Sequence, residues 1–284
     1  MKIKEILHPE ILLGRRGGAA QRELYQQVLK SIAFVPGTIA GAMYNREICP
    51  VDLTADKNFA THFLLCKIFR ERHGRTYYIP RDFARALSLI DRDIPVDYLP
   101  RSFTGYIHFQ EGGLEDDAGG VVGAYVCIGP AREVIFAAAG EPQPEPESAS
   151  VSLSYLNTQR PMQGWLDFWP VTKLTCELKP QKVLEVIEHI PRVPDRGPNG
   201  QLRTALPDEV RERRAGIYRA IINAVLYIHS RGATLAKTKS MGETTNSERT
   251  RLRREHGWEN LSGIPVTVVN PGYKDREYTV DSTM

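Results

Sequence analysis

The amino-acid sequence predicts an α+β fold: N-terminal helices, a central antiparallel β-sheet, a long core helix, and a basic C-terminal helix with a terminal strand. Helical periodicity dominates the first hundred residues. Strand-like alternation of apolar and polar residues follows over residues 102–178, and helical periodicity returns at 181–190 and 207–232. We therefore divide the chain into a mainly helical part, residues 1–98, and a part with the sheet, its packed helices and the basic C-terminal region, residues 99–284.

Three helices are expected in the first part of the chain. Residues 19–32 carry leucine, valine and isoleucine at helical spacing, and Pro36 follows them. Residues 54–74 show a second helical pattern, which Gly74 is expected to close. A short extended segment then leads into a helix that begins near Pro80, a favourable residue in a first turn.

The central segment has the pattern of half-buried strands. Residues 102–109 and 121–129 predict two strands, and the Gly-rich loop between them suits an antiparallel hairpin. Residues 132–140 and 150–156 predict two more, separated by an acidic, proline-rich stretch that is too polar to pack. Residues 165–180 are expected to add one or two strands, with a proline at a bend or an edge.

The strongest helical pattern covers residues 207–232. Its first turn carries a proline and two acidic residues, which favour a helix start because negative charge there complements the helix dipole. Gly232 favours its end. The apolar positions share one side and are Ile217, Ile221, Ala224, Val225 and Ile228. We therefore expect a core helix packed on the sheet, and a last strand in the segment 264–270.

The composition is that of a globular protein with no strong preference for polyanions. Among 284 residues, 37 Lys and Arg face 34 Asp and Glu, which gives a net charge of +3. The four cysteines lie far apart and form no zinc-binding pattern, so we expect reduced thiols. No apolar run approaches the roughly 18 residues that a membrane span needs. These features predict a cytoplasmic protein that does not associate with membranes.

Catalytic motifs of nucleotide-binding loops, serine hydrolases and zinc proteases are missing from the sequence, so we assign no catalytic residue and no cofactor and favour a non-enzymatic protein. One arrangement suggests a metal-dependent nuclease instead. Glu177 and Lys179 are two residues apart, on one face of a predicted strand, and Asp167 precedes them. Nucleases of the PD-(D/E)xK type hold Mg²⁺ or Mn²⁺ between two such carboxylates and orient water with the lysine. The alternative is a solvated Glu/Lys pair on an edge strand.

The best candidate for a binding surface is a short basic helix over residues 246–256. Thr245 and Glu248 form a capping box at its start, and Gly257 is expected to end it. The residues that predict binding, in this helix and near it in sequence, are Arg249, Arg251, Arg253, Arg254, His256, Trp258, Lys237 and Lys239. Leu252 is the one apolar residue inside the helix, so core packing does not explain the arginines. RNA, DNA or an acidic protein surface would suit these cations, whereas a solvated surface helix is the alternative.

Four segments resemble the second of the type V-A anti-CRISPR families. They are the strand pair SFTGYIHF and GAYVCIG, the strand–turn–helix CELKPQKVLEVIEHI, the apolar helix GIYRAIINAVLYIHSRGATLAK, and the basic stretch from Arg249 to Trp258 ahead of IPVTVVN. In the strand–turn–helix, the family's Q-x-V-x-E-V positions are Gln181, Val183, Glu185 and Val186.

This resemblance implies an α+β protein of a phage or plasmid that has no enzymatic activity and inhibits a host defence. It would lower the level of a type V-A effector nuclease by acting on its production. The implied partners are RNA and a host or defence-system protein, the latter as a nascent chain or within a ribonucleoprotein. A phage structural or assembly component stays open as a further alternative.

Overall fold

The structure is a computed structural model of the chain. It describes residues 2–3, 68–70, 72–90, 98–116, 119–130, 149–157, 171–178, 208–238, 245–247, 250–251, 259–260 and 264–273, together with residues 23, 26, 65 and 254. The predicted strand at 132–140 and helix at 181–190 lie outside these residues. Residues 23, 26, 65 and 68–70 are helical, within the two predicted N-terminal helices.

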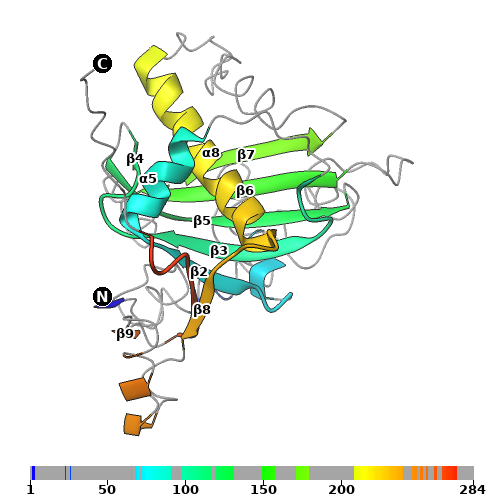
Figure 1. The fold of residues 1–284 in the computed structure, drawn as a ribbon. Helices are drawn as coiled ribbons and strands as arrows, with labels where there is room; N and C mark the ends of the chain where they lie inside the picture. Colours follow the sequence, from blue (N-terminus) through cyan, green and yellow to red (C-terminus); the bar gives the residue numbers. More distant parts are fainter. Residues whose placement is uncertain are drawn as a thin grey trace, which may run out of the picture.

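The described strands form an eight-stranded sheet in the order β7-β6-β5-β3-β2-β10-β8, with β4 paired to β5 beside this path (Figure 1). Along the chain the strands of this sheet are β2 (Arg75–Ile79), β3 (Phe103–Phe109), β4 (Glu115–Asp116), β5 (Gly119–Pro130), β6 (Ala149–Asn157), β7 (Val171–Leu178), β8 (Leu235–Thr238) and β10 (Val266–Val269). A separate parallel pair joins β1 (Lys2–Ile3) to β9 (Glu259–Asn260).

Strand β2 makes this sheet mixed rather than antiparallel throughout. It is parallel to β3 on one side and to β10 on the other, whereas the other described pairs of this sheet are antiparallel. Parallel neighbours need a crossover, and helix α5 (Arg81–Leu89) provides it between β2 and β3. The predicted α+β class and the predicted hairpin of β3 and β5 are confirmed. The tail strand β10 lies between β2 and β8, inside the sheet.

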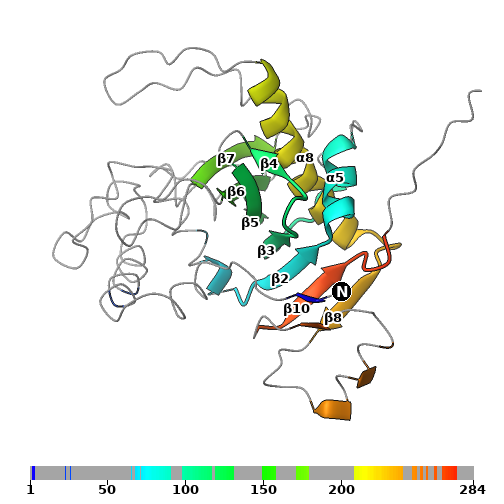
Figure 2. The ribbon, with the colours of Figure 1, turned by 90° about the vertical axis from the view of Figure 1, so that its left-hand side faces the viewer.

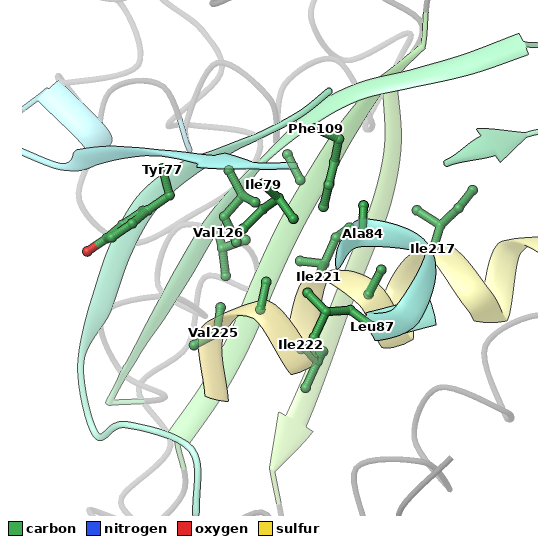
Figure 3. Packing of buried hydrophobic residues seen from close by; sticks show 14 of the residues in the cluster. Tyr77, Ile79, Ala84, Leu87, Phe109, Val126, Ile217, Ile221, Ile222 and Val225 are labelled. Atoms are coloured by element: carbon green, nitrogen blue, oxygen red, sulfur yellow. The ribbon is translucent and has the colours of Figure 1, made fainter. Parts of the chain in front are cut away.

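Helices α5 and α8 (Asp208–His229) lie on one face of the sheet, as both ribbon views show (Figures 1 and 2). All five apolar positions predicted for α8 are buried, which confirms it as a core helix. They pack with α5 and with the facing sides of β2, β3 and β5 (Figure 3). Because β2 and α5 precede residue 98, this one core joins residues from both sides of that position. The helix ends at His229, three residues before Gly232, where the Ser230 amide donates to the Tyr227 carbonyl.

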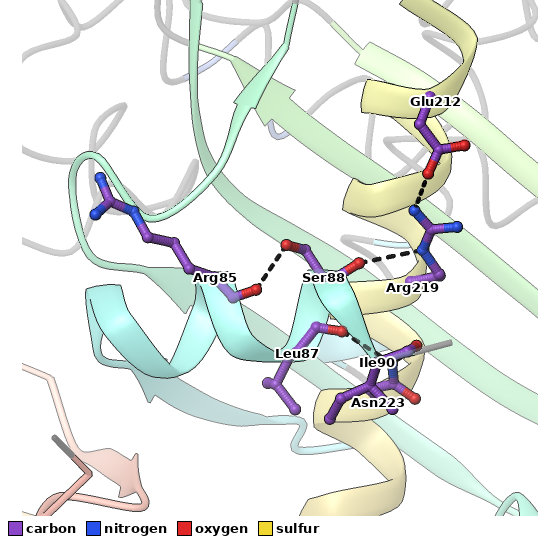
Figure 4. A network of polar contacts seen from close by, with 7 residues as sticks. All are labelled: Arg85, Leu87, Ser88, Ile90, Glu212, Arg219 and Asn223. Atoms are coloured by element: carbon purple, nitrogen blue, oxygen red, sulfur yellow. Dashed lines mark hydrogen bonds and ion pairs between the residues drawn. The ribbon is translucent and has the colours of Figure 1, made fainter. Parts of the chain in front are cut away.

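Polar contacts lock α5 onto α8 at the end of α5 (Figure 4). The Asn223 side-chain amide donates to the carbonyls of Leu87 and Ile90, at 2.9 and 3.2 Å. The Arg219 guanidinium donates to the Ser88 carbonyl at 3.1 Å and also pairs with Glu212. The last carbonyls of a helix have no partner within the helix. The side chains of Arg219 and Asn223 on α8 therefore act as the C-terminal cap of α5.

Removing the Asn223 amide is expected to destabilise the fold measurably. In Asn223→Ala the carbonyls of Leu87 and Ile90 lose this donor, which should cost about 1–3 kcal/mol. Ser88→Ala is the matched control, since its hydroxyl donates to the Arg85 carbonyl in the last turn of α5, where the bond is exposed, and its loss should cost about 0.5 kcal/mol or less. Urea unfolding followed by circular dichroism checks both variants, and equal midpoints would contradict this capping role.

The opposite face of the sheet carries a buried aromatic cluster of Tyr78, Tyr106, His108 and Tyr125. The His108 ring stacks on Tyr78 with centroids 5.5 Å apart, and Tyr106 lies 4.8 Å from Tyr125. Gly123 makes room for this cluster, because a Cβ there would lie 2.5 Å from the Tyr106 hydroxyl and 2.6 Å from the Ile107 carbonyl oxygen. Both faces of the central strands are therefore buried, although only one is covered by α5 and α8.

Candidate anion-binding site at the strand ends

The basic C-terminal helix is partly described and begins where the sequence predicts. Thr245 is not helical, while Asn246, Ser247, Thr250, Arg251 and Arg254 are, and all of these side chains are exposed. The Thr250 hydroxyl donates to the Asn246 carbonyl one turn back, at 3.0 Å. Arg249, Arg253, His256 and Trp258 lie outside the described residues. The described turns lie beyond β8, away from α5 and α8 (Figures 1 and 2).

Lys237, another predicted binding residue, is exposed on β8. Strand β8 ends the described strand order, and Lys237 is opposite Thr267 of β10. Thr267 is in turn opposite Tyr77 of β2, so these three residues share one face of the sheet. Arg75 lies two residues before Tyr77 and is on that face too. Lys239 is outside the described residues.

A cavity of about 470 Å³ opens where β2 and β10 begin and β8 ends. The apolar side chains of its described lining are Phe69, Ile264, Pro265 and Val266. The polar residues of its described lining are Arg75, Lys237 and the threonines Thr76, Thr238 and Thr267; the strand register puts Arg75, Lys237 and Thr267 on one face of the sheet and Thr76 and Thr238 on the other. Among the described residues that line it, two are cationic, Arg75 and Lys237, and none is acidic.

The chain reversal before β2 sets the position of Phe69. The Gly74 amide donates to the Phe69 carbonyl at 2.7 Å, and the His73 amide donates to the Arg70 carbonyl at 3.2 Å. His73 has a φ of 50°, so this is a Schellman motif with a histidine in the left-handed position. Gly74 was expected to close the helix, but it is the residue after the left-handed one. Its missing side chain matters because a Cβ would lie 2.3 Å from the Phe69 ring.

Arg75 is held near the mouth of the cavity by its neighbour on the strand. Burial raises the pKa of Tyr77, and the Arg75 guanidinium, which hydrogen-bonds the Tyr77 hydroxyl, offsets part of that rise. The Tyr77 ring belongs to the core, while its hydroxyl points out of the cluster (Figure 3). Arg75 itself is exposed, so its charge stays in contact with solvent.

The nuclease hypothesis depends on residues that are mostly outside the described part. Glu177 lies on β7, where its backbone is opposite Ser150 of β6. Asp167 and Lys179 lie outside the described residues, so a site with Mg²⁺ or Mn²⁺ stays a prediction. Within the part of the chain that the structure describes, no three His, Cys, Asp or Glu side chains are grouped to hold a metal ion.

The sequence pattern predicts Lys237 as a binding residue but does not single out Arg75 or Phe69. Neither stands out in its local pattern, since Phe69 has helical spacing and Arg75 begins a short extended segment. The parallel pairing of β2 with β10 brings them to Lys237, more than 160 residues later in the chain. No spacing rule within one segment reveals such a long-range contact.

Comparison of the chain with protein-family models, with curated proteins and with solved structures found no match. In the described residues, no helix has both the length and the apolar character needed to cross a membrane. Any functional assignment therefore depends on the residues themselves.

Proposed function

We propose that this protein is a non-enzymatic RNA-binding regulator that engages RNA, free or within a ribonucleoprotein, through its basic C-terminal region. The observation that carries the proposal is the exposure of Arg251 and Arg254 on helical turns beyond β8, the strand that also exposes Lys237. Arginine and lysine side chains bind phosphate oxygens through charge-assisted hydrogen bonds. A single-stranded RNA is the polyanion best suited to a small patch of this kind, because it bends to follow the cations.

The distribution of charge supports a local binding surface. The whole chain has a net charge of only +3, so its overall field attracts polyanions weakly. Five basic residues fall between 249 and 256, against one acidic residue, Glu255. A local excess of this kind orients a polyanion toward one edge of the molecule.

The proposed biological effect of RNA binding is based on the resemblance to the second type V-A anti-CRISPR family. On that basis the protein belongs to a phage or plasmid and reduces production of a defence nuclease by acting on its nascent chain and message. A basic surface that holds RNA fits an action during translation. The protein partner in that setting is proposed on the resemblance alone.

Replacing the two described arginines is expected to weaken RNA binding about tenfold. Arg251→Ala combined with Arg254→Ala removes two phosphate contacts and should also flatten the dependence of log affinity on log salt by about 0.7 per contact. Fluorescence anisotropy with a labelled single-stranded RNA, titrated at several salt concentrations, measures both effects. Adding Arg249→Ala and Arg253→Ala should abolish binding.

A control for net charge is available on the helix layer. Arg85 of α5 and Arg213 of α8 are exposed and belong to the helix layer, not to β8 or to the basic C-terminal helix. Arg85→Ala combined with Arg213→Ala changes the net charge equally and should leave RNA affinity within about twofold. If both double variants lose the same RNA affinity, the loss comes from net charge alone, and this outcome would contradict the proposal.

A further inference from the structure

We infer that the outer edge of β8 binds an extended acidic segment of a partner protein, which adds to the sheet as an antiparallel strand. The bound segment places a carboxylate opposite Lys237 and an apolar side chain opposite Leu235. This inference goes beyond RNA binding, because it assigns β8 a protein ligand and depends on none of the arginines of the C-terminal helix.

The backbone of β8 directs the polar groups of two residues away from β10, its neighbour at this end of the sheet (Figure 2). The Asn270 amide donates to the Thr234 carbonyl at 2.8 Å, so these two residues form a hydrogen-bonded pair. Along an antiparallel pair, such residues alternate with residues whose N–H and C=O groups point away from the neighbour. On β8 the latter are Leu235 and Lys237. Within the described strand order β8 pairs with β10 alone, so these groups can bond an added strand.

The edge is already held in an extended conformation before any partner binds. At the start of β8 the Thr234 amide donates to the Tyr227 hydroxyl at 3.2 Å. The Tyr227 ring in turn packs edge-to-face on Phe83, with centroids 4.9 Å apart. At the other end the Thr238 hydroxyl donates to the Val266 carbonyl at 2.8 Å. Binding therefore requires little ordering on this side of the interface, which favours affinity.

Leu235 provides the apolar part of the proposed site. It is opposite Val269 of β10, which is fully buried in the core beneath α5 and α8. Leu235 itself is 41% exposed, so the apolar row of this face reaches solvent at β8. An apolar side chain on an added strand, directly opposite Leu235, continues the row and covers this exposed surface.

The charge of this segment favours an acidic partner over a second copy of the chain. Residues 231–240 contain Arg231, Lys237 and Lys239 and no Asp or Glu. Lys237 is exposed on β8, and Arg231 is exposed in the turn before it. Opposite charges stabilise a cross-strand pair, whereas like charges destabilise it. Two copies paired through β8 would bring these cations together, so the lysine disfavours self-pairing, as lysines on edge strands commonly do.

The first test reverses the charge of Lys237 in the full chain. The probe is a fluorescently labelled peptide of about eight residues, rich in threonine and valine, with one glutamate two residues before a leucine. We expect Lys237→Glu to weaken its binding about tenfold, and a peptide with lysine in place of the glutamate to recover affinity for this variant. Arg213→Glu on α8 changes the net charge equally and should leave affinity within about twofold. Fluorescence anisotropy measures each affinity.

The second test removes one outward N–H group. Leu235→Pro leaves the hydrogen bonds to β10 in place, because the lost N–H points away from that strand, and proline is tolerated at such edge positions. It should weaken peptide binding about tenfold, whereas Leu235→Ala, which keeps the N–H, should weaken it about threefold. Circular dichroism verifies that each variant is folded. RNA affinity should change less than about twofold in Leu235→Pro, since its charge is unchanged.

Several outcomes would overturn the inference. The peptide fails to bind, or it binds Lys237→Glu and Leu235→Pro as it binds the wild type. Light scattering shows a dimer that Leu235→Pro dissociates, which would assign the edge to a second copy. Lys237→Glu loses RNA but keeps the peptide, which would assign Lys237 to nucleic acid. Peptide binding without RNA binding supports the inference and contradicts the proposed function alone.

Discussion

Ile221→Ala should lower the free energy of unfolding by about 2–5 kcal/mol, more than any other single substitution proposed for this chain. Ile221 is fully buried on α8, in the cluster that also holds Leu87 of α5 and Val126 of β5 (Figure 3). The truncation removes apolar contacts and leaves a cavity that the surrounding side chains of α5 and the sheet fill only partly. Urea unfolding followed by circular dichroism measures the loss.

Leu89→Ala provides the matched control for this prediction. Leu89 lies at the end of α5 and is 79% exposed, so a truncation of similar size should change stability by about 0.5 kcal/mol or less. Similar losses in the two variants would contradict the packing of α8 as the central helix of the core.

The second large effect concerns pH. Burial lowers the pKa of His108 from 6.5 to about 3, and its Nδ1 atom has no hydrogen-bond partner among the residues that the structure describes. The rings of Tyr78 and Tyr106 face it, and burial raises the pKa of Tyr78 to about 12, so that phenol stays neutral in acid. His108 is therefore neutral in the folded chain throughout the mildly acidic range.

The sign of the pH effect follows from this lowered pKa. Between pH 6.5 and 3 the unfolded chain binds a proton at His108 that the folded chain does not. Its contribution to stability is thus fully present above pH 6.5 and is lost as the pH falls through this window, by on the order of 1 kcal/mol per pH unit. His108→Phe keeps an aromatic ring and removes the titration, so its stability should fall less steeply between pH 6.5 and 4.5. Parallel curves for the two proteins would show that His108 does not titrate in this way.

The helices and hairpin were predictable from the sequence because their signals are local. The apolar positions of α8 repeat at helical spacing, and β3 and β5 alternate around a Gly-rich loop. The position of β2 was not predictable in the same way. The sequence of its five residues does not indicate parallel pairing. Its neighbour β10 lies near the C-terminal end of the chain, far from β2 in sequence.

In the candidate site, too, the features with local sequence signals were predictable and those that depend on long-range strand pairing were not. A capping box and a run of arginines reveal the basic helix, since both features lie within a short stretch of sequence. The cavity needs Phe69, Arg75 and Lys237 together, which only the strand order β2-β10-β8 brings about. His73 shows another limit: Gly74 was expected to close the helix, and the left-handed residue of that helix end is His73.

Affinity purification of the full chain from a bacterial lysate, with quantification of the RNA recovered after ultraviolet crosslinking, tests RNA binding most directly. We expect RNA to be recovered with the wild-type chain and with the Arg85→Ala, Arg213→Ala control, and to be largely lost with Arg251→Ala, Arg254→Ala. RNase treatment before purification should release partners that are bridged by RNA. Recovery no higher than in a lysate without the protein, or equal recovery for all three chains, would contradict binding of RNA through the basic C-terminal region.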